Sequence, residues 1–336
     1  MKKLTVTLLI VMPLMTFYLV GPKVEEANLN APIVEPTANL EELDTYIKLE
    51  EEANEAIKPD NESRIIWADS VPKKTEYSFV YLHGWSASYA EGDPLHKEIA
   101  KRYGANLYLP RLAGHGLSEE EPMLDLTATE LMKSARHAVA VGKQLGEKVI
   151  LLTTSTGGTL GLYLASQDPK IAGLILYSPN VDMRDPASKL LNMPWGLEIA
   201  RLVKDSKYHE WQLDSVRELY WTNKYRLEAL THLREMVDET MTEEVFEKVT
   251  QPVFLGYYYK DEENQDDVVS VEAMLEMYEQ LGTPDDKKEE VAFPEVGHHV
   301  IGSHLTSNDL DAVRHETFEF LEGVMGLVPG RPTLER

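Results

Sequence analysis

The chain changes its pattern near residue 64, where short apolar runs begin to alternate with longer amphipathic stretches. The short runs are rich in β-branched and aromatic residues, as strands are, and lie at 64–68, 77–82, 105–109, 149–153, 171–177, 253–258 and 291–293. Helical spacing is found between several of them, at 94–103, 128–145, 158–166, 271–281 and 309–325. This alternation predicts an α/β fold with a mostly parallel sheet that carries helices on both faces. The first two runs are joined by a Pro-Lys-Lys turn and could form an antiparallel pair at the entry to the sheet.

One long interval, residues 183–245, breaks the alternation. It has a helical pattern without a convincing strand, and it contains the aromatic residues Trp195, Trp211, Tyr220, Trp221 and Tyr225. A plain surface excursion would be a poor place for so many exposed aromatic side chains. We therefore expect a helical cap over the active edge of the sheet, called the cap segment below. The α/β core is expected in two pieces, 63–182 and 246–336.

Residues 22–62, ahead of the core, are predicted to be an acidic linker and a helix. The first part is polar and contains prolines, which is typical of a tether. From Leu40 to Ile57 apolar residues recur near helical spacing with glutamates between them. We expect this helix to lie on the surface of the core.

Residues 1–21 have the pattern of an N-terminal membrane anchor or signal. Lys2 and Lys3 precede an uncharged stretch from Leu4 to Gly21, which is just long enough to cross a bilayer as a helix. No pair of small residues at cleavage spacing follows directly, which favours an uncleaved anchor over a removed signal peptide. The two lysines favour a cytoplasmic N-terminus, so the catalytic domain is expected outside the cytoplasm. The alternative is a secreted or periplasmic protein after signal cleavage.

Composition narrows the classes of function. The 336 residues include 33 basic and 57 acidic side chains, a formal net charge of -24, which argues against binding to nucleic acid. The hydrophobic share of 43% is enough for a substantial core. The absence of cysteine excludes disulfides, thiolate metal sites and a cysteine nucleophile.

The stretch ILLTTSTGG at 150–158 places a serine where a buried strand meets a helix. Thr153 and Gly157 flank Ser155 in the order small-x-Ser-x-small, which is the pattern of a nucleophile elbow. The backbone turns so tightly there that larger side chains would clash. Ser-Thr-Gly-Gly also occurs in ordinary turns, so Ser155 needs support from the rest of the chain.

A serine nucleophile needs a base, and the base needs an orienting acid. In doubly wound hydrolases both follow later strands, in the order Ser, Asp or Glu, His. The strand predicted at 253–258 is followed by a carboxylate-rich loop, in which Asp266 is the expected acid and Asp267 the runner-up. The strand predicted at 291–293 is followed by the sequence EVGHHV, in which His298 directly follows a glycine and is the expected base.

A metal site would be a different explanation of the histidines. His298, His299 and His304 could be ligands, but no carboxylate lies at a recognised ligand spacing. A metal ion is therefore not expected.

The oxyanion of a tetrahedral intermediate needs amide donors. The N–H of Thr156, the residue after the serine, is one candidate. The second is the N–H of Trp85, in the sequence YLHGW that ends an early strand, where Gly84 permits the turn. His83 is expected to fix this loop by hydrogen bonds rather than to act as a base.

The segments YLHGW, LPRLAGHGLS, TTSTGG, DDVV and VGHHV occur in the order and approximate spacing of the α/β-hydrolase superfamily. Over residues 64–325 the chain most resembles its serine esterases and monoacylglycerol-lipase-like members. The resemblance implies an eight-stranded, mostly parallel sheet and ester cleavage through an acyl-enzyme, without metal or organic cofactor. It also implies a triad of Ser155, Asp266 and His298. Two departures stand out: Thr153 replaces the usual glycine, and the acid loop is longer and more acidic than usual.

The resemblance and the aromatic cap segment predict a serine hydrolase that acts on a short or medium acyl ester or a monoacylglycerol. A peptidase of the same fold is a second candidate, and it would need glutamates in the cap segment, for which Glu198, Glu210, Glu218 and Glu228 are available. A glycan deacetylase of the same fold and a catalytically inactive binding module are the third and fourth candidates.

Overall fold

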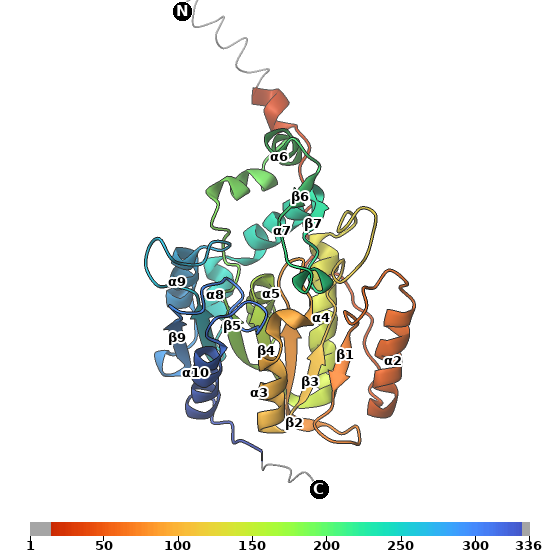
Figure 1. Ribbon diagram of the computed structural model, residues 1–336, viewed down its shortest axis with the longest axis vertical. Helices are drawn as coiled ribbons and strands as arrows, with labels where there is room; N and C mark the ends of the chain where they lie inside the picture. Colours follow the sequence, from red (N-terminus) through yellow and green to blue (C-terminus); the bar gives the residue numbers. More distant parts are fainter. Residues whose placement is uncertain (1–14, 331–336) are drawn as a thin grey trace, which may run out of the picture.

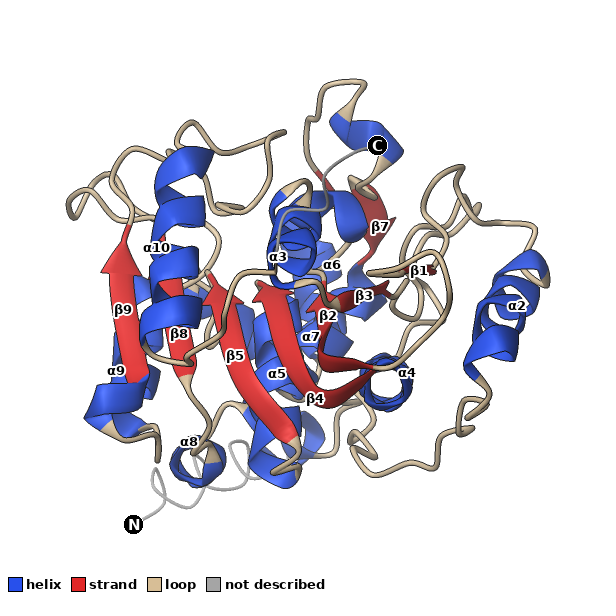
Figure 2. Ribbon diagram, turned by 90° about the horizontal axis from the view of Figure 1, so that it is seen from below, coloured by secondary structure: helices blue, strands red, loops and turns tan. Residues whose placement is uncertain are grey.

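A seven-stranded sheet forms the centre of the protein in the computed structural model, which describes residues 15–330 (Figure 1). The strand order is β1-β3-β2-β4-β5-β8-β9, and Figure 2 shows β2, β4, β5, β8 and β9 side by side. The bounds are β1 Arg64–Ile66, β2 Thr75–Leu82, β3 Asn106–Leu109, β4 Gly146–Thr154, β5 Ile171–Tyr177, β8 Val253–Tyr257 and β9 Lys288–Ala292. Every pair is parallel except β1 with β3. The predicted α/β fold with a mostly parallel sheet is confirmed.

Two details of the predicted sheet are wrong. β1 pairs antiparallel with β3, with Arg64 opposite Leu109, and not with β2. The reason is that β2 is bonded in parallel to β3 on one side and to β4 on the other, so β1 is left with the free edge of β3. The sheet also has seven strands in residues 15–330, where the family resemblance implies eight.

Helices cover both faces of the sheet, as predicted. Alternate residues of each central strand point to opposite faces: Val80 and Leu82 pack in one core, and Phe79 and Tyr81 in the other. The first core contains side chains of α4 (Ala128–Leu145), α5 (Thr156–Gln167), α8 (Glu243–Lys248) and α9 (Val271–Gln280). The second contains side chains of α3 (Leu95–Tyr103) and α10 (Leu310–Gly323). Near-continuous burial on both faces is what a parallel sheet requires.

The cap segment contains more than helices. Its elements are η2 (Pro186–Asn192), α6 (Gly196–Lys204), β6 (Tyr208–Glu210), η3 (Arg217–Leu219), β7 (Lys224–Arg226) and α7 (Leu227–Thr240). β6 and β7 form a small antiparallel sheet, with Tyr208 opposite Arg226. Strands of three residues are too short to show alternation, so the sequence pattern did not reveal them. In Figure 1 α6, β6, β7 and α7 lie together at the end of the molecule from which the N-terminal segment leaves.

The predicted acidic helix is α2 (Leu40–Glu52), which lies beside β1 (Figure 1). Asn39 caps its first turn, and its apolar face buries Leu43 and Ile47 completely or nearly so. The helix is therefore attached to the core, as expected.

The N-terminal segment reaches the cap segment. Residues 15–19 are helical, and the Phe17 ring stacks on that of Trp195 with a centroid separation of 4.9 Å. The backbone N–H of Trp195 donates to the carbonyl of Pro22 at 2.8 Å. Within residues 15–330, no helix is both long and apolar enough for a membrane span. Most of the predicted anchor, residues 4–14, lies outside the described residues.

Candidate functional site

Ser155 lies at the junction of β4 and α5 in a backbone conformation that few side chains adopt. Its φ and ψ are 53° and −119°, and the side chain is 6% exposed. The carbonyl of Ser155 accepts the amides of Gly158 at 2.8 Å and Asn180 at 3.0 Å, while its own amide donates to Tyr177 at 3.0 Å. Hydrogen bonds to α5, to the end of β5 and to the loop after β5 therefore hold this strained backbone in place.

Close packing explains the small residues around this corner. A Cβ atom at position 157 would lie 1.9 Å from the carbonyl oxygen of Leu82, so only glycine fits there. Thr153, the departure from the family pattern, is accommodated because its hydroxyl donates to the carbonyl of Ile175 at 3.0 Å. A Cβ atom added at Gly161 would lie 3.0 Å from the methyl carbon of Thr153. Threonine therefore fits at position 153 because the residue of α5 that faces it, Gly161, has no side chain.

Asp266 is completely buried in the loop after β8, and both oxygens of its carboxylate accept hydrogen bonds. Oδ1 accepts the amides of Val268 and Val269 at 2.9 and 3.0 Å, and Oδ2 accepts from Nδ1 of His299 at 2.6 Å. Burial alone would raise the pKa of Asp266, but the charge and hydrogen bond of His299 and the two amides lower it. Asp266 is therefore an ionised, oriented acceptor, whereas Asp267 has no such contact with His299 among the described hydrogen bonds.

The histidine that pairs with Asp266 is His299, so the expected pairing of Asp266 with His298 is wrong. His299 is 6% exposed. Burial by itself would lower the pKa of His299, but the charge and hydrogen bond of Asp266, together with the charges of Glu91 and Asp267, raise it. Because Nδ1–H donates to the carboxylate, Nε2 carries the lone pair of the neutral ring.

His298 accepts a hydrogen bond from the backbone of its own loop. The amide of Val300 donates to Nδ1 of His298 at 2.9 Å. Burial and the positive charges of His299 and Arg217 lower the pKa of His298 to about 4. The side chain is half-buried and lines the same cavity as His299, but it contacts neither Asp266 nor Asp267 through a hydrogen bond among residues 15–330.

The loop after β2 lies directly against Ser155. A Cβ atom at Gly84 would lie 2.9 Å from the Cβ of Ser155. The amide of Leu112 donates to Nε2 of His83 at 3.1 Å, so Nδ1 of that ring carries the proton and donates to the carbonyl of Gly84 at 3.0 Å. Burial lowers the pKa of His83 to about 3, which keeps the ring neutral. His83 thus fixes the loop as expected.

Fixing the Gly84 carbonyl also orients the next amide. In a trans peptide the C=O and N–H groups point in opposite directions, so the bond from His83 leaves the N–H of Trp85 on the other side of the peptide plane. Thr156 is the first residue of α5, and its N–H is one of the four that have no acceptor within a helix. Both residues line the cavity beside Ser155.

A cavity of about 680 Å³ brings the candidate residues together. Ser155, Thr156, Trp85, His298 and His299 line it from the core side. The cap segment supplies the opposite wall, which is mainly apolar: Leu190, Leu191, Ile199, Ala200, Val203, Trp211, Trp221, Tyr225, Leu227, Leu230 and Leu233. Three of the five predicted aromatic residues are in this wall. The arrangement leaves space for an apolar group beside the Ser155 side chain.

The glutamates that a peptidase would need are elsewhere. None of Glu198, Glu210, Glu218 and Glu228 is among the described residues that line the cavity. Glu228 instead pairs with Arg201 at 2.6 Å and with Arg226.

A metal site finds no support in the described residues. Among residues 15–330, no group of three His, Asp or Glu side chains is arranged to hold a metal ion. His304, one of the three histidines considered as ligands, instead donates from Nδ1 to the carbonyl of Asp93 at 2.8 Å.

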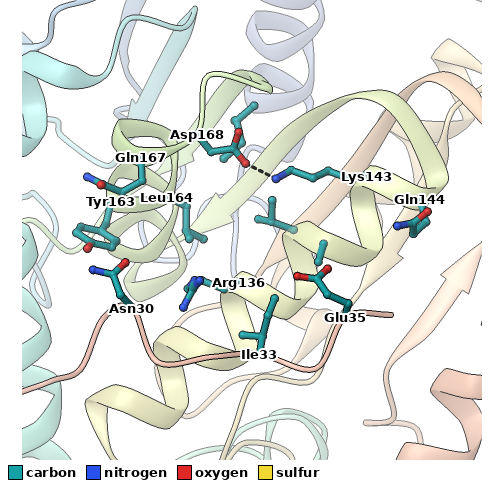
Figure 3. A pocket seen from close by; sticks show the side chains of 13 residues that line it. Asn30, Ile33, Glu35, Arg136, Lys143, Gln144, Tyr163, Leu164, Gln167 and Asp168 are labelled. Atoms are coloured by element: carbon teal, nitrogen blue, oxygen red, sulfur yellow. Dashed lines mark ion pairs between the residues drawn. The ribbon is translucent and has the colours of Figure 1, made fainter. Parts of the chain in front are cut away.

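A second cavity, of about 440 Å³, lies between α4, α5 and the linker, and contains none of the predicted site residues (Figure 3). Its polar side chains include the ion pair of Lys143 with Asp168.

Glu91 is a residue of the site that the sequence did not predict. This glutamate is 2% exposed and lines the main cavity, although the stretch YAEGDP around it has the composition of an exposed turn. Burial raises its pKa to about 7. Its only sequence signal is its position, seven residues after Gly84 in the loop region that follows β2.

Comparisons with known proteins agree with the fold. The family described as "Alpha/beta hydrolase family" matches residues 79–315. The thermostable monoacylglycerol lipase of Bacillus sp. (strain H-257) is 30% identical over 159 residues, which are 47% of this chain and 61% of that lipase.

Solved structures show the same fold at lower identity. One, for the metagenome-derived lipolytic enzymes LipS and LipT, has a TM-score of 0.63 at 19% identity and covers 80% of this chain and 99% of its own. The monoacylglycerol lipase of Paleococcus ferrophilus has a TM-score of 0.57 at 15% identity, with 78% and 98% coverage. A soluble variant of the Saccharomyces cerevisiae monoglyceride lipase has a TM-score of 0.59 at 14% identity, with 78% and 91% coverage.

Proposed function

The chain belongs to the α/β hydrolase family, and on that basis we propose that it is a serine hydrolase that cleaves carboxylic esters through an acyl-enzyme. The observation that carries the proposal is the 2.6 Å hydrogen bond from His299 to buried Asp266, because His299 lines the same cavity as Ser155. The corrected triad is Ser155, Asp266 and His299, and His298 has no part in it.

In the first half of the reaction, Nε2 of neutral His299 takes the proton from the Ser155 hydroxyl as its oxygen attacks the ester carbonyl carbon. Asp266 holds the ring by Nδ1–H and stabilises the imidazolium that forms. The carbonyl oxygen becomes negative and accepts hydrogen bonds from the amides of Trp85 and Thr156. The carbon–oxygen bond then breaks, and His299 gives its proton to the leaving alcohol.

In the second half, a water molecule takes the place of the alcohol. His299 removes a proton from this water as it attacks the acyl carbon, and the bond to Ser155 breaks with return of the proton to the serine oxygen. The products are a carboxylic acid and the free enzyme. This cycle needs no metal or organic cofactor.

The apolar wall supplied by the cap segment favours a short or medium acyl chain or a monoacylglycerol as substrate. Its leucines and aromatic side chains would contact the acyl chain. The relatives named above that act on monoacylglycerols support the same class. The absence of the four cap glutamates from the described lining of the cavity weighs against a peptidase.

The direct test is labelling with a fluorophosphonate and turnover of nitrophenyl esters of graded chain length. The wild type should be labelled and should hydrolyse at least one ester, and Ser155→Ala should lose both activities. A wild type that shows neither activity would contradict the proposed function.

We also propose that the protein works at a lipid surface through its N-terminal segment. The described end of that segment exposes Phe17, Leu19 and Val20 to the extent of 62, 61 and 74%, and packs on the cap segment. On the neighbouring helix α6, Leu202 and Val203 are 82 and 78% exposed. Exposed apolar side chains from two segments in contact are typical of a surface that meets lipid.

A further inference from the structure

Glu91 is a buried carboxylate inside the main cavity that the ester hydrolysis described above does not use. It belongs to the short helix η1 (Tyr89–Gly92) and is 2% exposed. Burying a carboxylate is unfavourable unless donors or opposite charges compensate for the lost water. Its partners therefore indicate why it is there.

Two donors reach the same carboxylate oxygen of Glu91. The backbone N–H of Gly84 makes a short hydrogen bond to Oε2, and the Tyr81 hydroxyl donates to it at 3.4 Å. Tyr81 lies in β2 and is also bonded to the Thr154 hydroxyl at 2.9 Å, next to Ser155. Both donors thus belong to β2 and to the loop after it, which carries the candidate oxyanion donor Trp85, and Tyr81 also contacts the strand that ends just before Ser155.

Gly84 is held between Glu91 and Ser155. A Cβ atom there would lie 2.7 Å from Oε1 of Glu91 and 2.9 Å from Cβ of Ser155. The peptide on the other side of Gly84 is fixed by His83, as described above. Glu91 and His83 together therefore hold both the N–H and the C=O of this residue, whose carbonyl shares a peptide with the N–H of Trp85.

The negative charge of Glu91 also acts on the base. Two titratable side chains face Glu91: Tyr81 from β2 and His299 from the loop after β9. Its charge favours the imidazolium form of His299, and His299 in turn favours the carboxylate form of Glu91. An opposite charge beside a base stabilises the charge that the base acquires when it takes the serine proton.

From these contacts we propose that Glu91 is a positioning residue for acyl transfer: its carboxylate holds the Gly84 amide so that Trp85 N–H faces the oxyanion, and its charge supports protonated His299. This inference rests on the proposed function. It makes activity depend on two deprotonated groups, His299 as the base and Glu91 as the carboxylate.

The test is the pH dependence of kcat/KM for a nitrophenyl ester in the wild type, Glu91→Gln and a matched control. Glu91→Gln keeps the shape and one acceptor oxygen but removes the charge. Glu235→Gln is the control, because Glu235 is also buried, at 3% exposure, and accepts a backbone amide, from Ala27 at 3.2 Å, but does not line the cavity.

We expect Glu91→Gln to lower kcat about tenfold, less than the loss of a whole oxyanion donor, with KM changed less than about twofold. On the acid side, the midpoint of kcat/KM should lie at lower pH in Glu91→Gln than in the wild type, because the variant lacks the negative charge that stabilises protonated His299. Glu235→Gln should match the wild type.

An unchanged rate, or a lower rate with a wild-type pH profile, would overturn the inference and leave the proposed function standing. A wild type without turnover or fluorophosphonate labelling would overturn both. If Glu91→Gln does not fold, Tyr81→Phe removes one donor from the carboxylate, and the inference then predicts an acid limb displaced to higher pH. An acid limb that stays in place in Tyr81→Phe would also overturn it.

Discussion

Nδ1 of His299 donates to Oδ2 of Asp266 at 2.6 Å, across 33 positions of the chain. This contact joins the loop after β9 to the loop after β8, two parallel strands that are neighbours in the sheet. Both loops begin at the carboxyl ends of their strands, and Ser155 follows the carboxyl end of β4 at the same edge of the sheet. The fold therefore brings Ser155 and His299 into one cavity, with Asp266 buried behind the His299 ring.

The acid limb of the pH profile distinguishes the two histidines. The base must be neutral, so activity should be present at high pH and lost as pH falls through the pKa of that base. The pKa of His299 is raised, which predicts a limb with its midpoint above the ordinary value of about 6.5. A limb near pH 4, the lowered pKa of His298, would contradict this assignment in measurements of kcat/KM across the acid and neutral range.

Gly157→Ala should damage both stability and activity. The added methyl would meet the Leu82 carbonyl at 1.9 Å, which forces the turn apart. Overpacking of this kind costs about 3 kcal/mol, measured by urea unfolding, and kcat should fall because Ser155 and Thr156 shift with the turn. The matched control is Gly323→Ala in α10, where an added Cβ meets nothing within 4 Å. Equal stability of the two variants would show that the turn is not tightly packed.

The predictable part of the site is the part that depends on local sterics. Ser155 could be found from sequence because a strand that turns into a helix within two residues needs glycine at 157. The base could not be chosen in the same way, because Gly297 precedes two adjacent histidines, and only the folded loop shows that the second of them, His299, contacts Asp266. The burial of Glu91 could not be predicted from its own segment, because the partners of its carboxylate, Gly84 and Tyr81, lie on a different element.

Ile199→Trp should change the preference for acyl chain length. Ile199 lies on α6 and lines the apolar wall of the cavity, so a larger side chain shortens the space for the chain. We expect kcat/KM for octanoyl esters to fall about tenfold and that for acetyl esters to change less than about twofold. Leu202→Trp, on the same helix but 82% exposed and outside the cavity lining, is the control. Equal loss on both esters would argue against an acyl site at Ile199.

The proposal of a lipid surface predicts that the full chain floats with vesicles of phosphatidylcholine. A neutral lipid is the proper choice because the net charge of -24 is repelled by anionic lipid. Leu8→Lys with Val11→Lys places charges in the apolar stretch, and this variant should remain in the unbound fraction. A wild type that stays unbound, or a variant that floats equally well, would contradict the proposal.

The assignment of the base is tested most directly by kcat/KM and the fluorophosphonate labelling rate of His299→Ala and His298→Ala side by side. We expect a loss of about 10³-fold or more for His299→Ala, because the serine then has no base, and a change within about tenfold for His298→Ala. Circular dichroism of both variants would establish that they are folded. A folded His299→Ala with near wild-type rates, beside an inactive His298→Ala, would contradict the assignment of His299 as the base.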